Sequence, residues 1–245
     1  MSVQRRALPF SFVLFLLLFT LLSLLLSLVA NRRAATDAPT LTPVESTPSV
    51  VILDAGHGGE DGGAVSVVGD YEKDLNLALC RQMEILLRTN GIPTVMTRTE
   101  DILLYDKTVD YHGRKKALDL AARRAIAEAY PNGIFVSIHM NSYPLSQYHG
   151  LQVWYSPNHS ASRALAETIQ ATVAASLQPE NDRAVKVAGS NIYLLHRLQS
   201  PAVLVECGFL SNPEEAARLG DPSYRRQLAL VLSLSLMEWE NPAKK

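Results

Sequence analysis

The stretch of sequence that most constrains the fold is residues 50–59, an apolar, largely β-branched run that ends in a glycine-rich turn. A short apolar run closed by such a turn predicts a buried strand. His57 lies in the turn, directly after the expected strand. In open α/β sheets, ligands bind beyond the carboxyl ends of the strands. We therefore expect His57 to lie at a site of binding or catalysis.

Strand-like and helix-like segments alternate along the chain after residue 50. Apolar runs predict further strands near residues 94–97, 134–138, 151–155, 192–195 and 203–205. Helical periodicity and capping residues predict helices near residues 71–89, 114–130, 160–177, 213–220 and from residue 221. In the helix over residues 114–130 we expect Leu118, Ala122, Ala125 and Ala129 to face inward. The alternation, without any internal repeat, predicts a single α/β domain with a mixed, mostly parallel sheet of about six strands and helices on both faces.

The N-terminal part of the chain differs sharply in composition. Residues 10–30 are uncharged and rich in Leu, and as a helix they would span about 30 Å, the thickness of a bilayer core. This predicts a transmembrane signal-anchor, with residues 1–9 in the cytoplasm and the folded domain, residues 50–241, outside it. A cleaved signal peptide is the alternative, although its apolar part is usually only about 7 to 15 residues long. Residues 31–49 are rich in Ala, Thr, Pro and Ser, which is typical of a linker.

Charge and cysteine content exclude two classes of protein. The formal net charge is −1, and nucleic-acid binding normally requires a basic face, so we predict no nucleic-acid partner. Cys80 and Cys207 are the only cysteines, too few for a disulfide framework. We expect both to pack in the core.

Three polar residues of metal-binding type stand at the ends or starts of predicted elements. His57 and His139 each follow a strand, and Glu72 begins a helix. Two histidines and a glutamate can hold zinc with a fourth position open for water, which makes a water molecule acidic and polarises a carbonyl. Glu206, at the end of another strand, would then move a proton from the water to a leaving amine. Such a set is suited to amide hydrolysis.

Spacing alone leaves other interpretations open. The three residues form no compact zinc motif, and polar residues commonly end strands and cap helices in proteins without a metal. His149 is a rival ligand, although no long apolar run precedes it.

Four separated segments, residues 51–59, 72–75, 137–141 and 203–213, resemble the zinc-dependent N-acetylmuramoyl-L-alanine amidases of the Amidase_3 type. The resemblance implies that zinc is bound by His57, Glu72 and His139, that Glu206 is catalytic, and that a mixed sheet is flanked by helices. The implied substrate is peptidoglycan, cut at the amide between the lactyl group of N-acetylmuramic acid and the L-alanine of the stem peptide. Ala55, Met140 and Ser142 depart from the residues usual in this family, and none of them replaces a ligand or the base.

The chain is similar to the sporulation members of this family in the sequence of residues 191–195 and in having no wall-binding repeats. That similarity implies removal of stem peptides so that muramic lactam can form in the spore cortex, and a location between the membranes of the forespore. The sequence does not say whether an accessory protein is needed.

Further residues are weaker predictions. Asn141 follows His139 closely, and Arg183 and Lys186 could meet carboxylates of the peptide, since arginine binds that group well. Turn packing and simple solvation explain these three residues equally well. Asp54 would orient His57 by accepting its N–H, or would accept backbone N–H groups in the turn. Two other functions stay open: a zinc peptidase that cuts within the stem peptide, and a catalytically idle wall-binding module.

Overall fold

A mixed six-stranded sheet organises the residues that the computed structural model describes, which are 18–24, 49–106, 108 and 111–240. The strands lie in the order β2-β1-β3-β6-β4-β5. All neighbouring pairs are parallel except β4 and β6, which are antiparallel. Their bounds are β1 (Val51–Ala55), β2 (Thr94–Met96), β3 (Ile134–Asn141), β4 (Gln152–Tyr155), β5 (Lys186–Val187) and β6 (Ala202–Phe209). The predicted mixed, mostly parallel sheet is confirmed.

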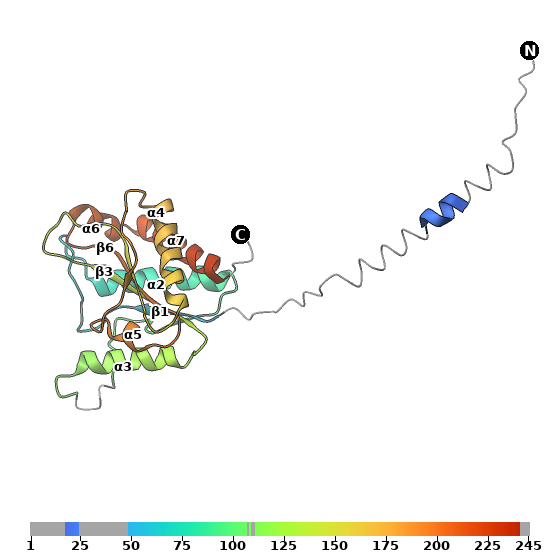
Figure 1. Cartoon of the computed structure of the whole chain (residues 1–245). Coiled ribbons are helices and arrows are strands. Elements are labelled where there is room, and N and C mark those ends of the chain that lie inside the picture. The colour runs from blue at the N-terminus through green and yellow to red at the C-terminus, as the bar shows by residue number, and fades with distance from the viewer. Residues whose placement is uncertain (1–17, 25–48, 107, 109–110, 241–245) are drawn as a thin grey trace, which may run out of the picture. The chain divides into compact units, whose positions relative to one another are not determined.

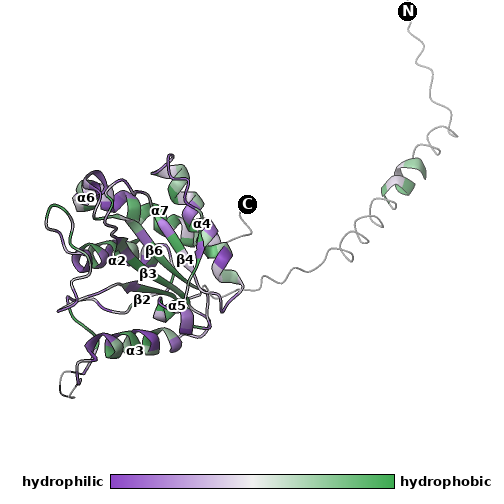
Figure 2. Ribbon diagram, turned by 60° about the vertical axis from the view of Figure 1, so that its left-hand side comes forward, coloured by the Kyte–Doolittle hydropathy of each residue, from purple (hydrophilic) through white to green (hydrophobic). Residues whose placement is uncertain are grey.

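Helices cover both faces of this sheet, as predicted (Figure 1). Helices α2, α4 and α7 pack on one face, and α3 and the short α5 lie on the other (Figure 2). The helices are α2 (Glu72–Thr89), α3 (Lys115–Glu128), α4 (Ala161–Ser176), α5 (Tyr193–Arg197), α6 (Pro213–Gly220) and α7 (Pro222–Glu240).

Alternation of side chains along the central strands divides the core into two parts and also places the polar residues. One set of strand residues, including Leu53, Val136 and Val205, belongs to the larger apolar cluster, to which α2, α4 and α7 also contribute side chains. The alternate set, including Phe135, packs against α3 and α5. Because strand side chains alternate with a period of two, this second face continues at the carboxyl ends of the strands into polar residues. These residues are Asp54, Ser137, His139 and Glu206.

Two local predictions are wrong. Residues 192–195, expected to form a strand, belong largely to α5. In α3 the expected inward face is wrong in part: Leu118 and Ala122 are half-buried and Ala125 and Ala129 are exposed, whereas the fully buried residues are Asp119, Arg123 and Ala127. The cause is an ion pair between Arg123 and the buried Asp54 of β1, which turns a charged face of the helix toward the sheet.

The predicted N-terminal transmembrane helix is also wrong. Among the described residues, no helix is both long enough and apolar enough to cross a membrane. Within residues 10–30 the structure describes a helix over 18–24. The rest of that segment, and almost all of the predicted linker, lie outside the described residues.

Candidate metal and catalytic site

The structure brings His57, Glu72 and His139 together at the carboxyl ends of β1 and β3. His57 follows β1, Glu72 is the first residue of α2, and His139 lies near the end of β3. Oε1 of Glu72 is 3.2 Å from Nε2 of His57 and 2.9 Å from Nδ1 of His139, and one ligand atom from each residue lies within 4.8 Å of the others. Tetrahedral zinc with ligands at about 2.1 Å separates them by about 3.4 Å. The donor set therefore fits a zinc ion.

Two glycines give these side chains room. A Cβ on Gly56 would lie 2.3 Å from ring atoms of His139, and one on Gly63 would lie 2.5 Å from Oε2 of Glu72. Gly63 also has a φ of 67°, which side chains disfavour. These close approaches to His139 and Glu72 explain why positions 56 and 63 are glycine.

The backbone at His57 is strained and is held by two arginines. His57 has a φ of 61°, in the left-handed region that is uncommon for residues other than glycine. Arg123 donates hydrogen bonds of 2.7 Å to the carbonyl oxygens of Ala55 and His57. Arg98 donates to the carbonyl oxygens of Ala55 and Gly56 at 2.8 and 3.0 Å. These buried guanidinium groups hold the turn that presents the His57 ring.

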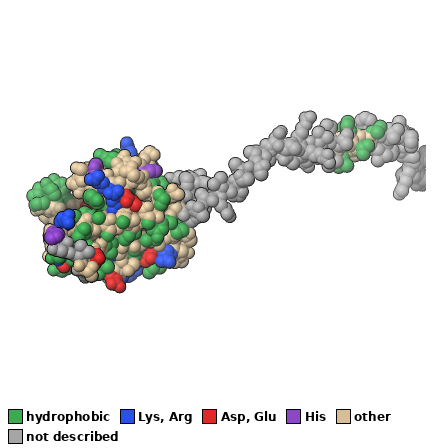
Figure 3. Space-filling model, turned by 90° about the horizontal axis from the view of Figure 1, so that it is seen from below, with side chains coloured by type: hydrophobic (Ala, Val, Ile, Leu, Met, Phe, Trp, Pro, Cys, Tyr) green, Lys and Arg blue, Asp and Glu red, His purple; other side chains and the backbone are tan. Residues whose placement is uncertain are grey.

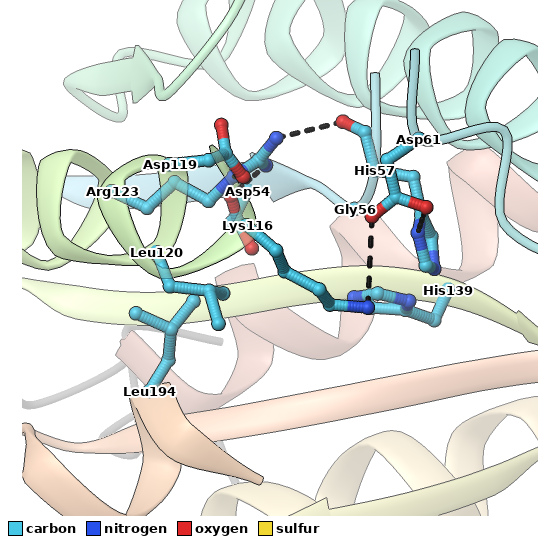
Figure 4. Close-up of a pocket in the computed structure, with 10 residues that line it drawn as sticks. All are labelled: Asp54, Gly56, His57, Asp61, Lys116, Asp119, Leu120, Arg123, His139 and Leu194. Atoms are coloured by element: carbon cyan, nitrogen blue, oxygen red, sulfur yellow. Dashed lines mark hydrogen bonds and ion pairs between the residues drawn. The ribbon is translucent and has the colours of Figure 1, made fainter. Parts of the chain in front are cut away.

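Asp54 acts on this turn through Arg123, and its partners among the described residues do not include the His57 ring. Its carboxylate accepts hydrogen bonds from Thr97 at 2.7 Å, Ser137 at 2.6 Å and Arg123 at 2.7 Å. Burial alone would raise the pKa of Asp54, but the Arg123 charge and these donors hold it below its usual value. Arg123 also pairs with Asp119 at 2.7 Å (Figure 4). Asp54 is therefore placed to support the turn and not the imidazole directly.

Asp61 is a functional candidate that sequence reasoning missed. Its Oδ1 lies 2.9 Å from Nδ1 of His57, on the opposite side of the ring from Glu72. Burial alone would lower the pKa of His57, but Asp61 and Glu72 together raise it to about 9. The contact with His57 in turn lowers the pKa of Asp61 to about 2. A carboxylate four residues after a predicted ligand, within the same glycine-rich turn, was the signal available in the sequence.

Glu72 is held as a carboxylate. Burial opposes ionisation, yet His139 and His57 keep the pKa of Glu72 well below its usual range. The backbone N–H of Ala64 donates to Oε2 at 2.8 Å, and that of Met140 donates to Oε1 at 3.1 Å. The side chain is therefore oriented by the backbone as well as by the two histidines.

Glu206 lies beside this trio on the same face of the sheet. It is paired with His139 in the register of β3 and β6, and both residues line one cavity. Burial raises the pKa of Glu206 to about 7. Its Oε2 is buried and accepts no hydrogen bond from the described residues. A buried carboxylate that titrates near neutrality and faces a cavity is typical of a general base.

The three weaker predictions lie elsewhere or have other partners. Asn141 ends β3 near the site, where its carbonyl accepts from the N–H of Leu210. Arg183 donates to the carbonyl of His149 at 2.7 Å and to Gln152 at 2.9 Å, so much of its donor capacity is used within the protein. Lys186 lies over the Trp154 ring on the edge of the sheet. Neither basic residue lines the cavities beside His139.

Comparison with known proteins places the chain in a family. A family model described as N-acetylmuramoyl-L-alanine amidase, Amidase_3, matches residues 51–236. The chain belongs to this family and is a hydrolase of the N-acetylmuramoyl-L-alanine amidase class.

Individual relatives agree with this assignment. The germination-specific N-acetylmuramoyl-L-alanine amidase of Bacillus subtilis (strain 168) is 34% identical over 191 residues, which cover 78% of this chain and 79% of the relative. The CwlD amidase of Clostridioides difficile, solved in complex with the GerS lipoprotein, has a TM-score of 0.73 and 34% identity, covering 78% of this chain and 98% of that one. The catalytic domain of CwlV from Bacillus (Paenibacillus) polymyxa has a TM-score of 0.65 and 32% identity, with coverage of 78% and 97%.

Proposed function

We propose that the catalytic centre of this amidase is a zinc site formed by His57, Glu72 and His139, with Glu206 as the general base. The observation that most supports this proposal is the meeting of three ligand atoms within 4.8 Å, beside a cavity that Glu206 also lines. The ligand types and their separations suit zinc, as argued above.

The chain's own residues would divide the chemical work among them. A bound zinc ion would supply Lewis acidity, which lowers the pKa of a water molecule to about 7 and polarises a carbonyl. Asp61 would hold the His57 ring through Nδ1, so that Nε2 faces the ligand set. Glu206 would accept a proton from the attacking water and deliver it to the alanine nitrogen as the amide C–N bond breaks. The products are a free lactyl carboxyl group on the glycan and a peptide with a free amine.

We further propose that the substrate is peptidoglycan outside the cytoplasm, and that spore cortex is its source. Membership of the amidase family supports the first part. The second rests on the similarity to the germination-specific amidase of Bacillus subtilis. In that setting, removal of the stem peptide would leave the lactyl carboxyl free for muramic lactam formation.

The test is mass spectrometry of muropeptides after purified full-length protein has acted on cortex and on vegetative peptidoglycan, with and without a chelator. We expect intact glycan with free lactyl carboxyl groups and peptides that begin with L-alanine. A peptidase acting within the stem would leave alanine on the glycan. Chelator should stop the reaction, and added zinc should restore it.

Glu206→Gln tests the assignment of the base. Loss of general acid–base catalysis should lower the rate by about 10²- to 10⁴-fold, with unchanged zinc content. The matched control is Glu180→Gln, because Glu180 is an exposed glutamate far from the site in the chain. Wild-type rates in the Glu206→Gln variant would remove Glu206 from the mechanism.

A further inference from the structure

A cavity of about 230 Å³ opens beside His139 and Glu206, between the sheet, α3 and α5. Its walls are mostly apolar and include Leu120, Phe135 and Leu204. A smaller cavity, about 90 Å³, lies against His57 and Asp61. The two cavities share Lys116, Leu120, His139 and Leu194 in their linings, so they adjoin at His139. The volume of the larger cavity exceeds what the reacting amide group alone would fill.

Lys116 supplies a cation at the junction of the two cavities. It projects from α3, and its side chain is 70% exposed. Figure 4 shows it reaching across the smaller cavity toward Asp61, and its Nζ lies 3.7 Å from Oδ2 of that residue. This separation is loose for an ion pair, so the amine remains available to a second anion. Figure 3 shows that basic and acidic side chains are interspersed on one face of the molecule.

We propose that this larger cavity is the subsite for the leaving peptide, with Lys116 paired to a stem-peptide carboxylate close to the scissile amide. This inference rests on the amidase function proposed above and deepens it. The apolar walls accept the methyl group of the first alanine. Lys116 binds a free carboxylate on the residue that follows alanine.

Two observations assign the cavity to the peptide and not to the glycan. The peptide side of the bond keeps its C-terminal carboxylate, whereas the lactyl carboxyl is consumed in the amide, so a cation at the rim favours the peptide. Glu206, which hands a proton to the leaving nitrogen, lines this larger cavity and not the smaller one. The leaving group therefore lies where its proton donor is.

The test uses two soluble muramoyl dipeptides that differ only in the residue after alanine, which carries either a free α-carboxylate or the corresponding amide. The quantity measured is kcat/KM for each substrate, with the full-length zinc-loaded protein. Charge-assisted contacts at a partly exposed rim are modest, so we expect the wild type to prefer the free carboxylate by about 3- to 10-fold. Lys116→Met should abolish this preference by lowering kcat/KM for the carboxylate substrate alone.

Lys115→Met is the matched control. Lys115 is the preceding residue on α3, pairs with Glu60, and lines neither cavity. It should keep the wild-type preference. A preference that survives in Lys116→Met, or one that both variants lose equally, would overturn the proposal, as would a wild type that cleaves both substrates equally well. Failure of the wild type to release alanine peptides from either substrate would instead count against the proposed function.

Discussion

Replacement of Arg123 by methionine tests whether the buried charge network supports the turn that carries His57. The side chain of Arg123 is 2% exposed and ion-pairs with Asp54 and Asp119, whose side chains are 1% and 5% exposed. The variant would leave both carboxylates buried without their cation, along with the carbonyl oxygens of Ala55 and His57. Removing one partner of a buried pair costs about 3–5 kcal/mol. We expect a loss of that size in the free energy of unfolding at pH 7.

The measurement is urea unfolding followed by tryptophan fluorescence, in the presence of chelator so that bound metal adds nothing to the stability. Arg124→Met is the control, because Arg124 is the next residue and forms an exposed ion pair with Glu128. The free energy of unfolding of that variant should be close to the wild-type value. If Arg123→Met lowers the free energy of unfolding by less than about 1 kcal/mol, the effect is no larger than that of an ordinary substitution. That result would refute the idea that the buried ion pairs stabilise the turn.

The pH dependence gives a second check on the same variant. In the wild type the pKa of Asp54 lies below its unfolded value, so its contribution is present above about pH 4 and is lost as pH falls through the lower folded value. In Arg123→Met, burial without the cation should raise the pKa of Asp54 above the unfolded value. The penalty is then largest at high pH and is relieved as the carboxyl takes up a proton. The difference in free energy of unfolding between the wild type and Arg123→Met should therefore narrow from pH 7 to pH 4.5. Adding Asp54→Asn to Arg123→Met should restore part of the lost stability at pH 7.

Two further predictions concern the ligand set and the base. Asp61→Asn should weaken zinc binding by about 10- to 100-fold, measured by chelator competition, because the orienting carboxylate on His57 is lost; unchanged affinity would show that Asp61 has no such role. Because burial raises the pKa of Glu206 to about 7 and the base must be unprotonated, kcat/KM at saturating zinc should fall as pH drops through about 7, and a flat profile from pH 5 to 9 would contradict the assignment.

Local sequence pattern was enough to predict the strand and turn at residues 50–59. It also predicted that His57, His139 and Glu206 lie at strand ends. Apolar runs set the strands, and strands of a mostly parallel sheet end at a common edge, so His57 and His139 were expected close together. The spacing alone could not show that Glu72 meets them. The resemblance to the amidase family implied it, and the structure brings the three residues together.

Other features depended on contacts between segments far apart in the chain. Arg123 lies 69 residues from Asp54, so their pairing leaves no local signal, and the buried face of α3 lies about one residue along from the expected face. Residues 192–195 were predicted as a strand because an apolar run of four residues is compatible with either a strand or a helix. The sequence by itself determined the order of elements and the residue types available for chemistry. Only the tertiary structure decided which charges are buried together, because burial depends on packing between elements and not on the pattern within any one of them.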